Sequence, residues 1–143
     1  MGLDFHPQQG AIVICDFKGL QEPEMVKRRP VVVISPRFRR RGKLCTIVPL
    51  STTTPSEIAN YHYKLLLDPP LPPPNDKPFC WVKADMIYTV SFDRLMLPFE
   101  GKDNSGKRIY DQRVLSDDDF RIIQKCLLHG VGLSKLTEHL HST

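Results

Sequence analysis

The sequence predicts a mainly β domain, a small and partly open antiparallel barrel with one C-terminal helix packed against it. Three observations support this prediction. Short apolar runs recur along most of the chain, glycine- and proline-containing segments separate them, and the hydrophobic period changes to that of a helix only at residue 116. About five to seven short strands followed by a helix are typical of this architecture.

The first strands are placed by runs of β-branched and other apolar residues. We expect strands at 10–17 and 30–35. The polar segment between them, 18–29, is long for a hairpin turn and is therefore a candidate functional loop. A third strand covers 43–51, and because Pro49 has no amide hydrogen to donate, it must lie at an edge or a bulge.

Later strands are shorter. In 61–67 the apolar side chains alternate, so that every second residue from Tyr61 to Leu67 shares one face. The proline-rich insert at about 68–78 predicts an extended, polyproline-like segment. We interpret it as a stiff surface loop in preference to an SH3-ligand-like motif. Further β-like runs follow at 79–82, 86–90 and 94–97, then a turn-rich segment, 101–107, and a short strand at 108–110.

The clearest helix begins after Ser116. This residue is a good N-cap, and the three aspartates that follow it favour the positive end of the helix dipole. Gly130 and Gly132 should end this helix. We expect a second short helix at 133–140, within a helical C-terminal segment, 116–141.

The composition is that of an ordinary globular protein. Hydrophobic residues make up 41% and charged residues 25%, and a length of 143 residues fits a single domain, 1–143. No apolar run approaches the roughly 18 residues of a membrane span, and the N-terminus lacks the features of a signal peptide. We therefore expect a cytoplasmic protein that does not enter the membrane.

No cofactor or metal site is predicted. The four cysteines are widely spaced and form no Cys-x-x-Cys pair, which favours reduced, buried thiols over a metal or redox role. His139 and His141 stand two positions apart in a helical segment, so they point to different sides of it.

Positive charge is concentrated between Lys27 and Lys43. This stretch holds eight basic residues and no acidic one, whereas acidic residues outnumber basic ones in the rest of the chain. Such a patch attracts a polyanion, although a solvated basic loop is the alternative interpretation.

Five segments, in this order and at this spacing, resemble the MazF/PemK toxins of type II toxin-antitoxin systems. The resemblance covers roughly residues 10–133. The segments are Gly10-Ala-Ile-Val-Ile-Cys-Asp-Phe17, Glu24 with Lys27-Arg-Arg-Pro-Val-Val-Val-Ile-Ser35, Ile47-Val-Pro-Leu-Ser-Thr52, Lys83-Ala-Asp-Met-Ile-Tyr-Thr-Val90 with Arg94-Leu95, and Leu115-Ser-Asp.

This resemblance implies an SH3-like barrel of the MazF/CcdB type that forms a homodimer. It also implies a toxin endoribonuclease that cleaves single-stranded RNA without a metal and leaves 2′,3′-cyclic phosphate and 5′-hydroxyl ends. The implied partner is an antitoxin with an acidic, otherwise disordered tail that lies across the RNA groove. Two alternatives are a non-catalytic nucleic-acid or gyrase-binding toxin on the same barrel, and a degenerate family member that acts as a regulatory partner.

The chain departs from the family pattern at two places near the expected site. Ala11 stands where an acidic residue usually follows the first glycine, and Ser51 stands at the position of the catalytic threonine. Because Thr52 is the next residue, either hydroxyl is a candidate.

Arg29 and Ser51 are the predicted catalytic residues. Cleavage of RNA without a metal needs a base, a proton donor for the leaving 5′-oxygen and positive charge on the transition state. The planar guanidinium of Arg29 can bind two phosphate oxygens, and because a guanidinium loses its proton very reluctantly we expect it to stabilise and donate rather than to act as the base. Ser51 would donate to a phosphate oxygen, although serine at a strand end is more commonly a turn former.

Two residues are candidates for the general base. Glu24 matches a family glutamate, and His62 titrates near neutral pH but could be satisfied by a neighbour in its strand. Trp81 is expected either to stack on a base or to lie in the core. The predicted RNA-binding residues, which combine positive charge with aromatic rings, are Lys27, Arg28, Arg37, Phe38, Arg39, Arg40, Arg41 and Trp81.

Overall fold

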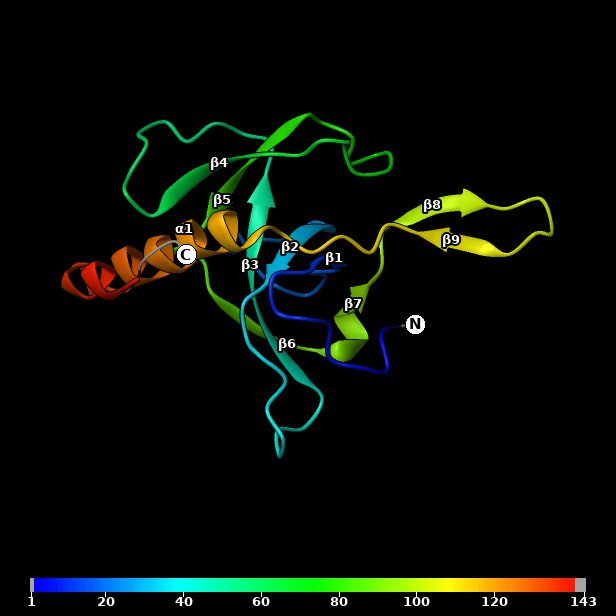
Figure 1. The fold of residues 1–143 in the computed structure, drawn as a ribbon, viewed down its shortest axis with the longest axis horizontal. Coiled ribbons are helices and arrows are strands. Elements are labelled where there is room, and N and C mark those ends of the chain that lie inside the picture. Colours follow the sequence, from blue (N-terminus) through cyan, green and yellow to red (C-terminus); the bar gives the residue numbers. More distant parts are fainter. Residues whose placement is uncertain (1, 141–143) are drawn as a thin grey trace.

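The computed structural model describes residues 2–140, which form nine β-strands, one α-helix and two 3₁₀-helices (Figure 1). The strands are β1 (Ile12–Cys15), β2 (Arg29–Val33), β3 (Leu44–Ser51), β4 (His62–Leu66), β5 (Phe79–Lys83), β6 (Tyr88–Ser91), β7 (Leu95–Met96), β8 (Phe99–Lys102) and β9 (Arg108–Tyr110). The helices are η1 (Phe92–Arg94), α1 (Asp117–Gly130) and η2 (Ser134–His139).

Seven strands form one antiparallel sheet that curves into a partly open barrel. Their order is β4-β5-β3-β2-β1-β7, and β6 pairs with β3 outside this path. The two ends of the path, β4 and β7, pair with only one strand each. The predicted mainly β fold with a partly open barrel and a C-terminal helix is therefore confirmed.

β3 is the central strand, and Pro49 lies where its partners change. Along one side, β3 pairs with β6 up to Ile47 and with β5 from Leu50 onward. Pro49 occupies the gap between these two ladders while its other side faces Val31 of β2. A proline is tolerated there because no neighbouring strand needs its missing amide hydrogen.

Two apolar clusters pack on opposite faces of the curved sheet, because side chains alternate along each strand. One cluster lies inside the barrel and includes Val13, Cys15, Phe17, Val31, Val33, Cys45, Ile47, Val90 and Leu95. The other lies between the sheet, α1 and the proline-rich segment, and includes Ile12, Val32, Val48, Leu50, Leu65, Leu71, Val82, Ile123 and Cys126.

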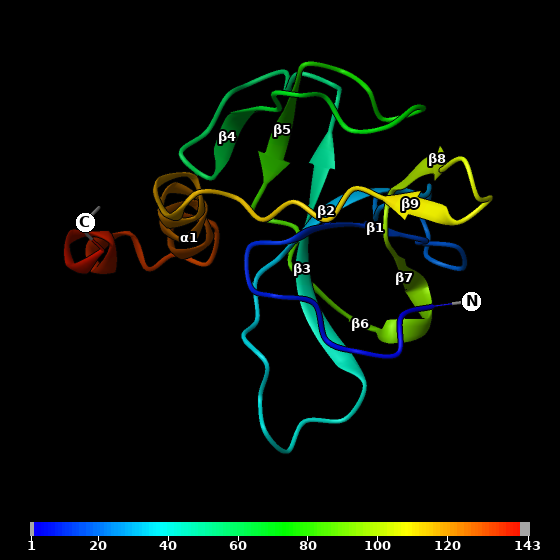
Figure 2. The same cartoon turned by 45° about the vertical axis from the view of Figure 1, so that its right-hand side comes forward.

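α1 begins as predicted and packs beside β4 and β5 (Figure 2). The Ser116 hydroxyl caps it by accepting the amide hydrogen of Asp119, and Tyr63 of β4 donates to the Asp119 carboxylate over 2.6 Å. A Cβ on Gly130 would lie 2.9 Å from the Ala84 carbonyl oxygen, so glycine is needed where the helix meets the sheet. None of the helices among the described residues is long and apolar enough to cross a membrane.

Two local predictions are refined by the structure. The second C-terminal helix, expected at 133–140, is present as the 3₁₀-helix η2, and residue 141, the expected end of the helical segment, lies outside the described residues. Residues 101–107 are not only a turn, because they join β8 and β9 in a two-stranded hairpin that projects away from α1 (Figure 1). The proline-rich residues 68–78 form a loop, as predicted.

Candidate functional site

The loop between β1 and β2 brings three predicted site residues together. Glu24, Lys27 and Arg29 line one open depression of about 300 Å³. Arg29 begins β2 and is half-buried, and its Nε atom is buried without a hydrogen-bond partner in the described part of the chain. Burial lowers the pKa of Arg29 from its usual value, and the nearby Tyr88 partly opposes this shift. A buried N–H group without an acceptor is costly, and a phosphate oxygen could satisfy it.

Two residues outside the loop hold it against the barrel. Arg94 donates from Nη1 to the carbonyl oxygens of Asp16 and Lys18, over 3.0 and 2.7 Å. Tyr88 of β6 accepts the amide hydrogen of Met25 over 3.0 Å, and its ring packs on Phe17. Tyr88 was missed from the sequence because only the folded barrel brings β6 beside a loop 63 positions earlier in the chain.

Ser51 lies in a row of side chains that crosses the sheet. Ser51 is paired with Trp81 of β5, which in turn is paired with Lys64 of β4. On the other side, β2 pairs with β3 as far as Val31 and Pro49. The ladder ends at that pair, and Arg29, two residues before Val31, lies on the same face of the sheet at the adjoining end of β2. Within the ladders, residues directly opposite in antiparallel strands have Cβ atoms about 5 Å apart.

This row lies on the face of the sheet that turns away from α1. Leu50, Val82 and Leu65 belong to the cluster under α1. Because side chains alternate, the residues next to them in each strand, Ser51, Trp81 and Lys64, point to the opposite face.

The same alternation separates the two candidate hydroxyls. Thr52 lines a cavity of about 160 Å³ together with Pro30 and Leu50, on the α1 side of the sheet. Ser51 is on the Arg29 side and is 5% exposed. Its Oγ accepts the amide hydrogen of Thr53 over 3.1 Å, so it also forms a local turn and keeps its own hydrogen for an acceptor. The geometry favours Ser51 over Thr52.

The two possible bases differ in their relation to Arg29. Glu24 lines the same depression, is exposed, and accepts the amide hydrogen of Gln21 over 2.9 Å. His62 is on the same face as Ser51 but in the next row of pairs, opposite Lys83. Its Nδ1 accepts the amide hydrogen of Ala59 over 3.0 Å, so this imidazole is held by its own loop.

Arg28 points away from Arg29. It lies 3.5 Å from the Asp16 carboxylate, is 61% exposed, and lines a separate cavity of about 370 Å³ beneath Pro72–Pro74. The two adjacent arginines therefore do not form one clamp.

The basic turn is separated from the row. Residues 36–43 lead into the first residue of β3, whereas Ser51 is the last, so seven residue steps, or about 23 Å along the strand, separate Leu44 from Ser51. Figures 1 and 2 both show this turn at the opposite end of the sheet from β4 and β5. Arg37 donates to the His6 carbonyl oxygen and Arg41 to the Thr46 hydroxyl.

The remaining residues of the basic turn are exposed. Arg39 and Arg40 have no hydrogen-bond partner within residues 2–140, and Phe38 is 54% exposed with the Arg41 guanidinium 5.5 Å from its ring centre. The sequence therefore predicted a basic turn correctly but could not show its distance from Arg29.

Trp81 is a core residue and does not have a free ring face for stacking on a base. It is 7% exposed, and its Nε1 atom is buried without a partner among the described residues. Of the two expectations for this residue, burial supports the core position.

Comparisons with known proteins identify the family of this chain. The family model described as "PemK-like, MazF-like toxin of type II toxin-antitoxin system" matches residues 8–129. This chain belongs to the PemK/MazF-like toxin family. It is 30% identical over 118 residues to the putative uncharacterized protein YifN of Escherichia coli K12, a match that covers 66% of this chain and 75% of that protein.

Solved structures share the fold. MazF of Deinococcus radiodurans superposes with a TM-score of 0.63 at 17% identity, over 90% of this chain and 99% of that one. An endoribonuclease from a mycobacterial species, solved in complex with its cognate antitoxin, superposes with a TM-score of 0.60 at 20% identity, over 89% and 96%.

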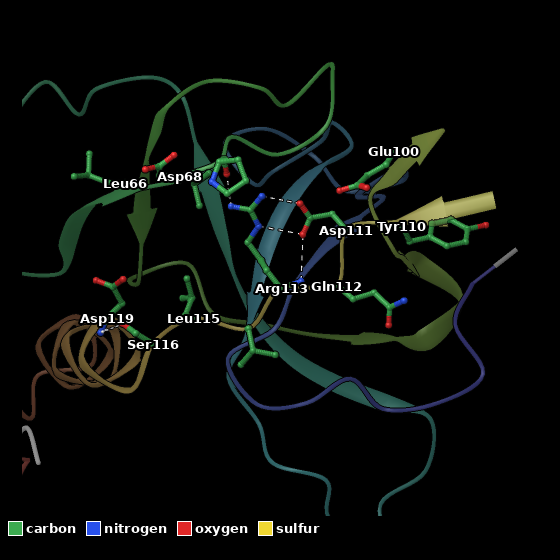
Figure 3. Close-up of a pocket in the computed structure, with 13 residues that line it drawn as sticks. Leu66, Asp68, Glu100, Tyr110, Asp111, Gln112, Arg113, Leu115, Ser116 and Asp119 are labelled. Carbon is green, nitrogen blue, oxygen red and sulfur yellow. Dashed lines mark hydrogen bonds and ion pairs between the residues drawn. The ribbon is translucent and has the colours of Figure 1, made fainter. Parts of the chain in front are cut away.

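A further cavity of this PemK/MazF-like chain lies away from this row and has a structural role. It measures about 440 Å³ and contains the Asp111–Arg113 ion pair, with 2.6 Å between Oδ2 and Nη2 (Figure 3). Arg113 also donates to the carbonyl oxygens of Pro69 and Pro70. The pair is thus internally satisfied, and it ties the proline-rich segment to the strand-like stretch before α1. Sequence patterns missed it because two residues at i and i+2 give no pairing signal.

The thiols and possible metal ligands offer no further site. The four cysteines are free and buried, and burial raises the pKa of Cys15 and Cys80 to about 12 and that of Cys45 and Cys126 to about 11. Such thiols are poor nucleophiles. Within residues 2–140 no group of three or more histidine, cysteine or acidic side chains is placed to hold a metal ion.

Proposed function

We propose that this chain is a toxin endoribonuclease that cleaves single-stranded RNA without a metal. The observation that supports this function best is Arg29, whose buried Nε has no partner among the described residues and which lies on the same face and at the same end of the sheet as the Ser51 hydroxyl. The family membership supports the same class of activity, and two structural relatives are described as endoribonucleases.

In the proposed mechanism, the 2′-oxygen of the ribose attacks the adjacent phosphorus in line with the leaving 5′-oxygen. Arg29 stabilises the charge on the phosphoryl oxygens and donates a proton to the leaving group, while Ser51 donates a hydrogen bond to a phosphoryl oxygen. The products are a 2′,3′-cyclic phosphate and a 5′-hydroxyl.

Glu24 is the favoured base. It lines the same depression as Arg29, whereas the Nδ1 atom of His62 is already engaged by Ala59. The acid and base roles are then divided between two residues. The carboxylate takes the 2′-proton, and the guanidinium supplies a proton on the other side of the phosphorus.

The proposed assembly is a cytoplasmic homodimer inhibited by an antitoxin. Relatives of this fold have been solved with a cognate antitoxin, as in the mycobacterial complex and in MazE–MazF of Deinococcus radiodurans. An acidic, disordered antitoxin tail would compete with RNA for the same positively charged groups.

The test uses end-labelled single-stranded RNA in buffer with EDTA. We expect the wild-type protein to cleave, and Arg29→Ala to cut at least ~100-fold more slowly, the scale for losing a main transition-state donor. The new 5′ ends should accept phosphate from a polynucleotide kinase without prior dephosphorylation, and the new 3′ ends should resist phosphatase until the cyclic phosphate is opened.

Arg28→Ala is the matched control, because it removes the same charge from the opposite side of the strand. It should weaken RNA binding more than turnover. Near-normal cleavage by a folded Arg29→Ala protein, or activity lost with EDTA and restored by a divalent metal, would refute the mechanism. Binding without cleavage by the wild type would instead favour a non-catalytic toxin.

A further inference from the structure

The face of the sheet that carries Ser51 continues across β5 and β4, where it holds buried and exposed hydrogen-bond donors together with apolar side chains. In β4 and β5 the residues on this face are His62, Lys64, Leu66, Phe79, Trp81 and Lys83. This set contains two lysines and a histidine but no carboxylate, although acidic residues outnumber basic ones in the chain outside Lys27–Lys43. A face with positively charged donors and no carboxylate is suited to a ligand whose charged groups are hydrogen-bond acceptors, such as a phosphodiester backbone.

Two buried donors without partners flank Ser51. Arg29 Nε and Trp81 Nε1 are the buried side-chain nitrogen and oxygen atoms in residues 2–140 that have no hydrogen-bond partner. Trp81 is paired with Ser51, and Arg29 lies on the same face of the sheet at the end of β2 that adjoins this end of β3. Buried polar groups are nearly always satisfied, so two orphan donors beside one hydroxyl indicate a missing acceptor.

Lys64 ends the row on its outer side. It is exposed, and its Nζ lies 4.2 Å from the centre of the Phe79 ring. This cation–π contact holds the ammonium group close to the sheet without neutralising its charge. Four neighbouring strands at about 4.8 Å spacing separate Arg29 and Lys64 by roughly 14 Å, enough for more than one phosphate of an RNA strand.

We propose that Trp81 and Lys64 extend the phosphate site of Arg29 and Ser51, so that RNA lies across β2, β3, β5 and β4. The indole N–H of Trp81 donates to an oxygen of the phosphate held by Ser51, and Lys64 binds a neighbouring phosphate. The ligand of this extension is the single-stranded RNA of the proposed function, on which the inference rests.

Trp81 provides its own spectroscopic probe. It is the only tryptophan in the chain, so a ¹H–¹⁵N spectrum contains a single indole signal. The ligand is a single-stranded RNA decamer of mixed sequence with 2′-O-methyl groups throughout, which cannot be cleaved because the attacking oxygen is blocked. We expect the indole proton signal to move downfield saturably, as it does when an N–H group gains an acceptor.

Lys64→Gln and Lys77→Gln form a matched pair of variants. Both remove one exposed lysine, but Lys77 lines the cavity on the α1 side of the sheet. For the 2′-O-methyl decamer, Lys64→Gln should lower affinity several-fold and reduce the slope of log affinity against log salt by about 0.7, the value for one phosphate contact of a single strand. Lys77→Gln should change neither.

Trp81→Phe tests the donor itself, because it keeps an aromatic ring and removes the N–H group. If this variant folds, affinity for the decamer should fall about tenfold or more, the scale of a hydrogen bond to a charged group. If it does not fold, the indole signal of the wild-type protein still decides the role of Trp81.

The outcomes separate this inference from the proposed function. An indole signal that stays in place at saturating decamer, or equal effects of Lys64→Gln and Lys77→Gln, would overturn the extension even if the enzyme cleaves RNA. A shifted indole signal in a protein that does not cleave unmodified RNA would support the extension and refute the nuclease mechanism. Absence of RNA binding would overturn both.

Discussion

At the scale of single residues, the side of the sheet separates the two candidate hydroxyls. Ser51 and Thr52 are neighbours in sequence, but Ser51 lies on the same face as Arg29 and Thr52 lines the cavity beneath the proline-rich segment. A family pattern alone leaves both as candidates, whereas strand alternation puts only Ser51 on the face to which Arg29 belongs.

This placement predicts different effects for two substitutions. Ser51→Ala should lower turnover of single-stranded RNA about tenfold or more at saturating substrate, because it removes one hydrogen bond to a charged group. Thr52→Val, which keeps the shape of the side chain, should leave turnover within about twofold. Single-turnover rates would check both, and a larger effect of Thr52→Val would transfer the catalytic role to Thr52.

Tyr88 is a second residue whose role depends on a single contact. Tyr88→Phe removes the acceptor of the Met25 amide hydrogen and so loosens the loop that carries Glu24 and Arg29. We expect a loss of about 1 kcal/mol in the free energy of unfolding. We also expect faster hydrogen exchange at the Met25 amide and lower turnover with little change in KM. Unchanged exchange at Met25 would show that the contact does not restrain the loop.

At the scale of secondary-structure elements, the length of β3 sets the arrangement of charge. The strand begins beside the basic turn and ends at Ser51, so about 23 Å of strand separate these two ends. In the proposed function, the basic turn of one chain therefore binds a more distant part of the same RNA or the acidic antitoxin tail, and not the phosphate assigned to Arg29.

The basic turn should act through long-range charge. Arg39 and Arg40 are the appropriate residues to change, because Arg37 and Arg41 have contacts within the chain. If the turn follows RNA, replacing both residues by glutamine should reduce the slope of log affinity against log salt by about 1.4 and barely alter turnover at saturating RNA.

Lys102 and Lys107 in the β8–β9 hairpin are the control for this experiment, because their joint replacement by glutamine removes the same charge elsewhere. Equal slopes for both double variants would mean that the turn does not contact RNA. The antitoxin would then be the expected partner of Arg39 and Arg40, with the same dependence on salt.

At the scale of the whole molecule, the Asp111–Arg113 pair joins parts that are distant in sequence. Asp111 is 8% exposed, and the hydrogen bonds from Arg113 hold the pKa of this carboxyl below its usual value. A lowered folded-state pKa means that the pair stabilises the protein above the unfolded pKa of about 3.9 and that this contribution is lost as pH falls through the folded pKa.

Arg113→Met should therefore be more harmful at neutral than at acid pH. At pH 7 it leaves a buried carboxylate without its cation, which costs about 3 kcal/mol. At pH 3 the isolated carboxyl is protonated, so the loss should be smaller. Urea denaturation at the two pH values would measure this, with Asp111→Asn/Arg113→Met as a control that recovers stability at pH 7. Equal losses at both pH values would contradict this account.

Local patterns in the sequence were sufficient for most of the elements. The apolar runs of β1 to β5, the alternation in β4 and the Ser116 cap are properties of neighbouring residues, so composition and period predict them. The charged turn and the buried thiols follow from residue type in the same way. The segments that resemble the MazF/PemK toxins are likewise short stretches of neighbouring residues, which is why the family could be inferred before the fold was known.

The tertiary structure decided which of these elements meet. The row from Arg29 to Lys64 comes from strands separated by many residues, and its order depends on the register between them. The link from Tyr88 to the loop, the role of Arg113 and the distance of the basic turn are likewise set by strand pairing and packing. A one-residue change of register would move every side chain of a strand to the other face, and the sequence of a single strand carries little information about that choice.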